Sequence, residues 1–445
     1  MSGIPVEISG RDKITESMRS LIAEHWFGQR SPNSPACDRL VKALAERHPG
    51  RIIEAPAGEE CLTWIMPRRW VVREAHITAP DGCRLADASA HPMHLWWHSI
   101  PVRRRLSLVE LQQHLFSDPQ RPDWIPFHYR NGYRHDAEEW GFSLPHSLRA
   151  GLKEGEYEVL IDSSLDNSGS VKVLDFHLPG RSPDCILFAA HTCHSAQVTD
   201  GLSCVAALSE LFSLLERVPR RRWSYRFVAG PEYYAAAAFL AKTPAAEVDR
   251  LRGGLYVDML GNGEPLAMQA SFAGESAVDR AARNVLLALD PQAKVLGYRK
   301  LWGNDETFYE GTGFRIPTPG LGGLPHERYH TSADNPENLD TDGLVRGLEV
   351  LLRIVRVLED DAVIVPRFRG PLYLSRYGLY IDPKLDPKGY ENLEAIQILM
   401  GERKSCLEIA DELDIDFFFV RKFAADLAGL DLVELRFDDA MLTAG

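Results

Sequence analysis

Two regions near the start of the chain carry hydrophobic residues at helical spacing. Apolar side chains recur with the period of one helix face over residues 13–28 and again over 36–48, which predicts two amphipathic helices. From about Arg51 the apolar runs become short and are separated by turns. Asp81-Gly82, between two strand-like runs, predicts a β-hairpin. Residues 51–128 are therefore expected to form a small β-rich domain.

From about Tyr157 strand-like and helix-like segments alternate. The segments YEVLID, VKVLDFHLPG, CILFAAHT, WSYRFVAG and GGLYVDMLGN are expected to be strands, and the last long helix is expected over 344–360. The near-continuous apolar run CILFAA is typical of a parallel strand buried on both faces. Alternation of this kind predicts an α/β sandwich around a mixed, mostly parallel sheet, built from residues 1–50 and 129–365.

The region after Pro366 predicts a third domain. Three short amphipathic segments precede the strand-like run LVELRF, and this order is typical of a winged helix, which we expect over residues 366–445. The region has ten Lys and Arg against fifteen Asp and Glu, and its segment DFFFVRKFAADLAG carries only Arg421 and Lys422 as cations. Because cations supply most nonspecific affinity for nucleic acid, we expect a packing or protein-interaction role, no tight DNA binding, and no part in the chemistry.

Composition narrows the class of protein further. At roughly 150 residues per domain, 445 residues predict about three domains. The formal net charge of −13 argues against a broad phosphate-binding surface, and no apolar run approaches the ~20 residues that span a membrane. The start of the chain lacks a signal-peptide pattern, and the seven cysteines are dispersed without a C-x-x-C pair, which predicts a cytoplasmic protein. Assembly into a homo-oligomer is left open.

Histidines and carboxylates stand where the predicted strands end. This set consists of His191, Asp200, Glu232, Asp258 and His330. Ligands of open α/β sheets gather at the carboxyl ends of strands, so these side chains are expected to converge. Imidazoles and carboxylates without clustered thiolates suit zinc in a catalytic site. Two metals can be accommodated, with His191 and Asp258 on one, Glu232 and His330 on the other, and Asp200 between them. Spacing alone does not separate a peptidase from a phosphatase or a deacetylase.

Four segments resemble, in order and separation, the metal-binding segments of the co-catalytic zinc aminopeptidases, whose clan also holds the glutaminyl cyclases. They are AAHTCHSAQVTDGLS, FVAGPEYYAAAAFL, LYVDMLGN and YHTSADN. The chain is most similar, over about residues 13–437, to bacterial aminopeptidase-like proteins with a small inserted β domain and a C-terminal winged helix. The resemblance implies a zinc-exopeptidase-like α/β/α sandwich in which residues 1–50 and 129–365 form the metallopeptidase-like catalytic domain and 51–128 the insertion.

The resemblance also implies an activity. A zinc-dependent hydrolase, an exopeptidase or amidohydrolase holding one or two zinc ions, would cleave the amide bond at the terminus of a peptide or aminoacyl compound through a zinc-activated water. Two alternatives stay open. One is a catalytically impaired aminopeptidase-like protein that binds or regulates through its winged helix, and the other is a glutaminyl-cyclase-like acyltransferase.

The chain departs from the family pattern at the first two segments. Cys193 stands where the aminopeptidases have the Asp of their H-x-D motif, and their Glu pair, a general base followed by a ligand, is reduced to Glu232 after a proline. Glu232 is therefore either a ligand or the general base, and Glu306 is the other candidate base. His194 is an alternative ligand to His191.

Overall fold

The large sheet has a parallel centre and antiparallel flanks. The computed structural model of the chain describes residues 3–5, 8–134 and 136–437. Within them, eight strands form one sheet in the order β1-β10-β12-β11-β13-β16-β14-β15. β12, β11, β13 and β16 run parallel, whereas β10 and β14 pair antiparallel with their neighbours on either side of that centre. The strand bounds are β1 Arg51–Pro56, β10 Ser170–Leu178, β11 Cys185–His191, β12 Ser224–Gly230, β13 Leu251–Asp258, β14 Leu266–Gln269, β15 Lys294–Leu296 and β16 Gly320–Gly323.

Helices cover both faces of this sheet. In β11, Ile186 and Phe188 belong to one hydrophobic cluster and Leu187 and Ala189 to another, as expected for a strand buried on both sides. The first cluster contains α1 (Arg11–His25), α2 (Pro35–Arg47), α5 (Leu202–Glu216), α8 (Ala277–Leu289) and α10 (Thr341–Asp360). The second contains α6 (Tyr234–Lys242), with α7 (Ala245–Val248) and α9 (Glu306–Tyr309). The predicted α/β sandwich with a mixed, mostly parallel sheet is confirmed.

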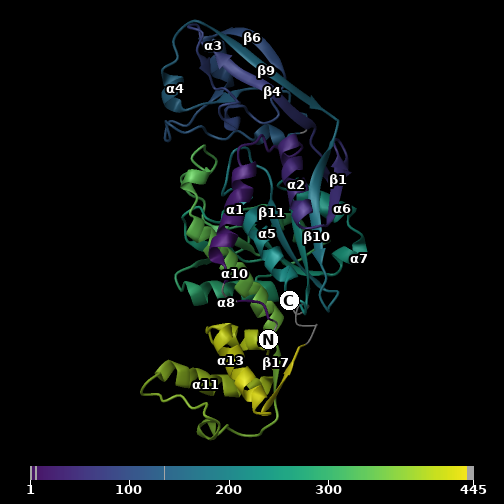
Figure 1. Cartoon of the computed structure of the whole chain (residues 1–445), viewed down its shortest axis with the longest axis vertical. Coiled ribbons are helices and arrows are strands. Elements are labelled where there is room, and N and C mark those ends of the chain that lie inside the picture. Colours follow the sequence, from purple (N-terminus) through teal and green to yellow (C-terminus); the bar gives the residue numbers. More distant parts are fainter. Residues whose placement is uncertain (1–2, 6–7, 135, 438–445) are drawn as a thin grey trace.

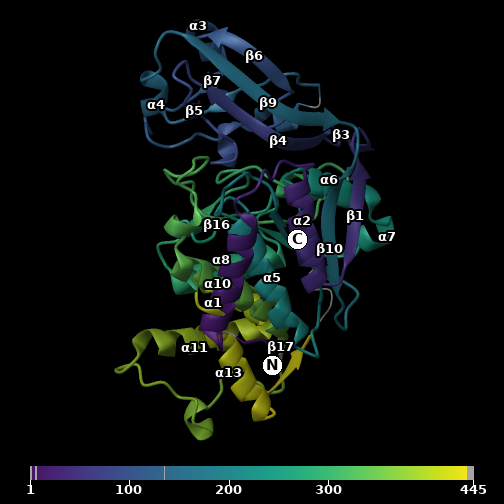
Figure 2. The same cartoon turned by 45° about the horizontal axis from the view of Figure 1, so that its top comes forward.

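A second, four-stranded sheet lies at one end of the molecule (Figures 1 and 2). Its order is β5-β4-β9-β6, with bounds Arg84–Leu85, Arg69–Thr78, Glu156–Asp166 and Val102–Ser107. The predicted hairpin is confirmed, because β4 and β5 pair antiparallel around Gly82, whose φ is 85°. Shorter elements of this region are β2 Glu60–Cys61, β3 Trp64–Ile65, α3 Leu108–Leu111, β7 Leu115–Phe116, β8 Phe142–Ser143 and α4 His146–Ala150.

The two sheets divide the chain differently from the predicted boundaries at residues 51 and 128. β1 joins the large sheet, where its residues Ile53 and Ala55 pack in the same cluster as α6. β9 joins the small sheet, where Tyr157 and Ile161 enter its separate core. The reason is tertiary pairing: each strand alternates buried and exposed residues, and alternation does not say which sheet a strand enters.

The region after Pro366 lies at the opposite end of the molecule from the four-stranded sheet (Figure 1). It contains α11 (Pro387–Leu399), α12 (Cys406–Glu412), α13 (Phe417–Gly429) and β18 (Val433–Arg436), and β18 pairs with β17 (Val363–Pro366). These helices share the hydrophobic cluster of α8 and α10, and Arg283 donates to Asp411 at 2.8 Å. The region is thus packed into the main core. The predicted domain ends at residues 1–2 and 438–445 lie outside the described residues.

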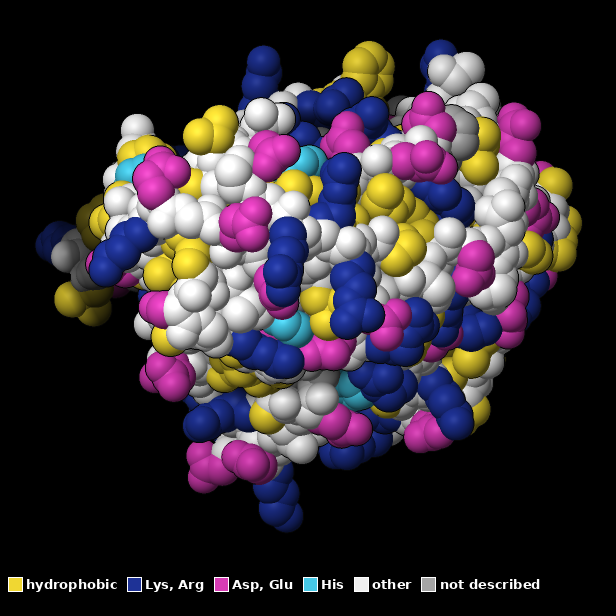
Figure 3. Space-filling view, turned by 90° about the horizontal axis from the view of Figure 1, so that it is seen from above, with side chains coloured by type: hydrophobic (Ala, Val, Ile, Leu, Met, Phe, Trp, Pro, Cys, Tyr) yellow, Lys and Arg dark blue, Asp and Glu magenta, His cyan; other side chains and the backbone are white. Residues whose placement is uncertain are grey.

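The outer surface at the end that carries the four-stranded sheet mixes both signs of charge. In the view onto this end, Lys and Arg side chains are interspersed with Asp and Glu (Figure 3). Arg105 of β6, for example, pairs with Glu158 of β9. Separately, none of the described helices has both the length and the apolar composition required to cross a bilayer.

Candidate metal centre

The predicted site residues are positioned at the carboxyl ends of the parallel strands. His191 and Asp258 are the last residues of β11 and β13, and Glu232 follows β12 by two positions. Asp200 precedes α5, and His330 lies in the loop between β16 and α10. Parallel neighbours end at one edge of a sheet, so segments spread along the chain meet there.

Asp200 lies between two imidazoles. Its Oδ1 is 3.1 Å from Nε2 of His191, and its Oδ2 is 3.0 Å from Nε2 of His330. Nε2 of His191 is also 3.4 Å from Oδ1 of Asp258. His191, Asp200 and Asp258 are buried, whereas the side chain of His330 is 17% exposed. The structure therefore brings four of the five predicted ligands together around one carboxylate.

The polar atoms of these side chains face one another. Within the described part of the chain, Nε2 of His191, Oδ2 of Asp200 and Nε2 of His330 are buried, and although they lie 3.0–3.4 Å from one another or from a neighbouring carboxylate oxygen, none makes a well-directed hydrogen bond. Unsatisfied buried polar atoms cost free energy, and convergent ones are what a metal site looks like without its ion. Among the described residues, three groups of side chains have ligand atoms within 4.8 Å of one another: His191, Asp200 and Asp258; His194, Asp200 and His330; and His191, Cys193 and His194. The donor set fits zinc.

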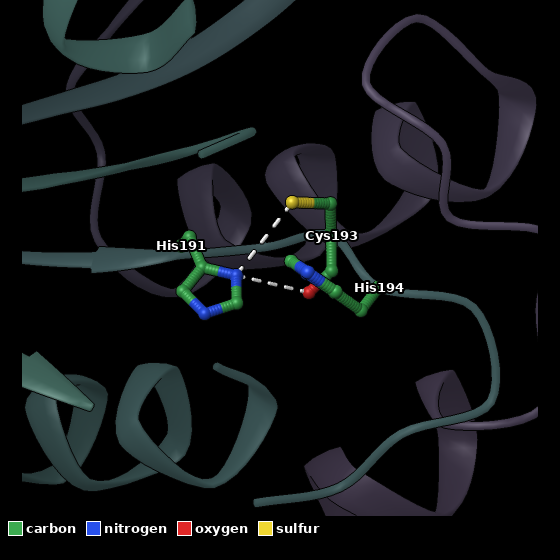
Figure 4. Close-up of side chains that lie close together, drawn as sticks. All are labelled: His191, Cys193 and His194. Carbon is green, nitrogen blue, oxygen red and sulfur yellow. Dashed lines mark hydrogen bonds between the residues drawn. The ribbon is translucent and has the colours of Figure 1, made fainter. Parts of the chain in front are cut away.

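A backbone carbonyl orients His191. Its Nδ1 lies 3.2 Å from the carbonyl oxygen of Cys193 and 3.6 Å from the Cys193 sulfur (Figure 4). With Nδ1 donating to the carbonyl, Nε2 faces the carboxylates of Asp200 and Asp258. Burial alone would lower the pKa of His191, but the carboxylates of Asp258 and Asp200 raise it well above its usual value. A metal bound at this nitrogen would take the place of a proton.

Asp334 ties together the loops that carry Asp200 and His330. Its carboxylate accepts hydrogen bonds from the backbone N–H groups of Val198, Thr199 and Asp200 at 3.2, 2.9 and 3.2 Å. It also accepts from the Thr199 hydroxyl at 2.8 Å. Asp334 is buried and stands four residues after His330. This one carboxylate sets the separation of the two loops.

Arg30 holds the other side of the same loop. Its guanidinium is completely buried and donates to the carbonyl oxygens of Thr192 at 3.1 Å and Gln197 at 2.7 Å. It also donates to the carbonyls of His25 and Trp26 at the end of α1. Neither Arg30 nor Asp334 was identified from the sequence, because each acts through backbone atoms of a distant segment that no local pattern specifies.

Glu232 lies next to His194 but belongs to none of the groups whose ligand atoms lie within 4.8 Å of one another. Its carboxylate accepts a hydrogen bond from the Tyr133 hydroxyl, and its backbone N–H points at the Cys193 sulfur at 3.3 Å. Its Oε2 is 3.9 Å from Nε2 of His194. Burial raises the pKa of Glu232 above its usual value, against the opposing effect of His191.

Glu306 does not belong to any of the groups of converging ligand atoms. Its carboxylate accepts from the backbone N–H of Asn304 at 2.9 Å and from the Gln269 amide at 3.1 Å. The Asn304 amide in turn points at Oδ2 of Asp258 at 3.4 Å. The oxygens of Glu306 are thus occupied by neighbouring donors, and Glu306 is linked to Asp258 only through Asn304. Burial raises its pKa to about 7.

Strained backbone gathers at this edge of the sheet. Positive φ values occur at Tyr233 (61°), directly after Glu232, at Met259 (53°), directly after Asp258, and at His330 itself (57°). Non-glycine residues adopt this region rarely, and only where the surroundings enforce it. The strain indicates that the directions of these side chains are fixed by the fold.

Residues 92–133, which include β6 and which we call the roof, contact the segments that carry the candidate ligands. The Trp97 indole donates to the Ser195 hydroxyl at 2.7 Å, and the backbone N–H of Phe127 donates to the carbonyl of His330 at 2.9 Å. The Tyr129 ring meets the His330 ring edge-on at 4.8 Å between centroids. Contacts to the roof therefore reach the loop after β11, the loop of His330 and, through Tyr133, the side chain of Glu232.

Solved structures share this architecture. A crystal structure from Clostridium acetobutylicum, named as a candidate peptidase, is similar with a TM-score of 0.83 and 24% sequence identity, over 96% of this chain and 97% of that chain. BSAP, a zinc aminopeptidase from Bacillus subtilis, is similar with a TM-score of 0.57 and 13% identity, over 80% of this chain and 96% of that chain. The fold is thus that of the aminopeptidase-like α/β proteins, as the sequence resemblance predicted.

The family follows from the sequence match. The family model described as "Domain of unknown function (DUF4910)" matches residues 19–361, and the chain belongs to this family. A Clostridium acetobutylicum protein is 27% identical over 371 residues, which are 83% of this chain and 80% of that protein. Its name refers to polysaccharide biosynthesis and to an aminopeptidase-like domain.

Proposed function

We propose that the protein is a zinc-dependent hydrolase of the aminopeptidase type, which cleaves the amide bond at the terminus of a peptide or aminoacyl compound. The observation that carries this proposal is the set of buried, unpartnered donor atoms on His191, Asp200 and His330. These residues and Asp258 would hold the metal. When bound, zinc supplies Lewis-acid polarisation of the substrate carbonyl and a nucleophile at neutral pH.

Glu232 is the proton acceptor in this proposal. It stands outside both groups of donor atoms, yet its Oε2 is 3.9 Å from His194, next to the centre. A carboxylate in that place can take a proton from the attacking water and deliver it to the leaving amine. Tyr133 fixes the carboxylate by donating its hydroxyl hydrogen, so the proton acceptor is already oriented before substrate binds.

The test begins with metal and turnover. Full-length protein purified without chelators should contain zinc by elemental analysis and should hydrolyse aminoacyl p-nitroanilides. A chelator should remove both zinc and activity, and added zinc should restore the activity. A protein that binds neither zinc nor cobalt would refute the proposal. Metal binding without turnover of any aminoacyl or peptide substrate would favour the binding or regulatory alternative.

The role of Glu232 has its own test. Glu232→Gln keeps the shape of the side chain and removes proton transfer, so the rate should fall ~10²–10⁴-fold while the zinc content stays at the wild-type value. Loss of one metal equivalent would show that Glu232 is a ligand instead. Glu306→Gln is the matched control, since Glu306 is also a buried, hydrogen-bonded glutamate. A larger loss of rate in Glu306→Gln than in Glu232→Gln, with metal retained, would transfer the role to Glu306.

A further inference from the structure

His194 is a buried imidazole that makes no hydrogen bond to the part of the chain that the structure describes. The residue is 2% exposed, and its Nδ1 is among the buried polar atoms without a partner. Buried histidines normally satisfy at least one ring nitrogen through a neighbour, because an unsatisfied polar atom costs free energy in a protein interior. The burial of this ring without a hydrogen-bond partner therefore requires an explanation.

The surroundings of His194 supply that reason. Its ring lies 5.4 Å from the His330 ring and 4.9 Å from the His191 ring, centroid to centroid. One ligand atom each of His194, Asp200 and His330 lies within 4.8 Å of the others. The same holds for His191, Asp200 and Asp258, and for His191, Cys193 and His194. The two groups that contain Asp200 share no other residue, which is the arrangement expected of two adjacent metals joined by a bridging carboxylate.

Glu232 does not complete the second group. It belongs to neither set of atoms within 4.8 Å, and its carboxylate is engaged by Tyr133. In the aminopeptidases that this sequence resembles, the corresponding position is a Glu ligand. Here the imidazole of His194 lies beside Asp200 and His330 instead. Its loop is held by hydrogen bonds to Arg30 on one side and to Asp334 on the other.

We propose that His194, and not Glu232, is the third protein ligand of the second metal position, together with Asp200 and His330. This inference rests on the proposed function for the presence of metal. It leaves Glu232 free to accept protons, and it gives each metal a bridging oxygen from Asp200 and two further protein donors. Neutral imidazoles and carboxylates of this kind are normal zinc ligands.

Cobalt titration of the full-length protein tests the inference without relying on turnover. Metal-free wild-type protein is titrated with Co²⁺ against a competing chelator, and the visible absorption and bound equivalents are recorded. We expect two equivalents for the wild type and for Glu232→Gln. His194→Ala should keep one equivalent and bind the second at least ~10-fold more weakly. His326→Ala is the matched control, because His326 is buried, lies 3.4 Å from the Thr199 hydroxyl and belongs to neither group.

Thermal unfolding gives a second, independent readout. His194→Ala leaves a cavity among the rings of Trp97, Phe127 and His330, so the Tm of the metal-free protein should fall, and the increase in Tm on adding Co²⁺ should be smaller than in the wild type. His194→Gln, closer in volume, is measured alongside in case the alanine variant does not fold.

Each outcome decides the inference. Two equivalents of unchanged affinity in His194→Ala, or loss of one equivalent in Glu232→Gln but not in His194→Ala, would overturn it. A wild type that binds one metal, retained in His194→Ala, would overturn it and leave the proposed function standing. A wild type that binds no metal would overturn both.

Discussion

Asp334→Asn should loosen the metal centre without changing a single metal ligand. The asparagine has the same shape, but one of its two terminal groups becomes an NH₂ that faces backbone N–H donors. The Asp334 carboxylate accepts from the backbone of Val198, Thr199 and Asp200 and from the Thr199 hydroxyl. The substitution can preserve the bonds to one oxygen only, so about two of these contacts are lost.

The size of the effect follows from those contacts. Hydrogen bonds to charged groups contribute ~1.5–3 kcal/mol each, and neutral ones ~1 kcal/mol. Burial raises the pKa of Asp334 to about 6, which shows that the charged form is penalised in this place. We therefore take a value between the two and expect a loss of about 2–4 kcal/mol in the free energy of unfolding. Residues that orient metal ligands typically contribute 10–100-fold to metal affinity, so zinc affinity should fall by about that factor.

The assay needs a control for the loss of a buried carboxylate as such. Asp279→Asn provides it, because Asp279 is also buried and accepts from two backbone N–H groups and two hydroxyls, those of Ser271 and Ser276. Denaturant unfolding should show destabilisation of both variants. Zinc affinity, measured by chelator competition, should fall only in Asp334→Asn, and hydrogen exchange of the amides around Asp200 should rise only there. Wild-type zinc affinity in Asp334→Asn, or an equal loss in Asp279→Asn, would refute the reasoning.

Three further predictions concern the roof, the C-terminal region and nucleic acid. Tyr133→Phe removes the donor to Glu232 and should lower kcat ~10–100-fold at unchanged zinc content; an unchanged kcat would show that Glu232 needs no such support. Phe417→Ala removes a buried ring from the core that α13 shares with α8 and α10, so denaturant unfolding should show a loss of about 3–5 kcal/mol, and a loss below ~1 kcal/mol would contradict the packing. Gel shifts at low salt should show no tight DNA binding, since Arg421 of α13 is buried and donates to the carbonyl of Asp360; binding that weakens steeply with salt would contradict this expectation.

The sandwich could be predicted because its signals are local. The apolar run of β11 and the helical periodicity of 344–360 are written in consecutive residues, and the structure has β11 over Cys185–His191 and α10 over Thr341–Asp360. The convergence of His191, Asp200, Asp258 and His330 followed from one further rule, that parallel strands end at one edge.

The remainder depends on contacts between distant segments. β1 and β9 are each recognisable as a strand, but their sheet is determined by partner residues at least 49 positions away in the chain. Tyr133 lies in a stretch without a recognisable motif, and its role exists only because the fold brings it to Glu232. Glu306 shows what a sequence pattern does not contain: it is an acid near the expected segment, and only the structure shows that its oxygens accept hydrogen bonds from Asn304 and Gln269.

The way the chain passes from the small sheet to the large one has a mechanical consequence. β9 ends at Asp166 and β10 begins at Ser170, and Gly169 between them is tied to Ala57 by a backbone hydrogen bond of 3.2 Å. The hydrogen bond to Ala57 restrains this three-residue connection, and the hydrogen bonds of Trp97 and Phe127 to Ser195 and His330 hold the two parts together at a second place. The two sheets should therefore move as one rigid body. Access to the centre would then be controlled by side chains and loop tips, and a substrate would have to be small enough to enter without opening the molecule.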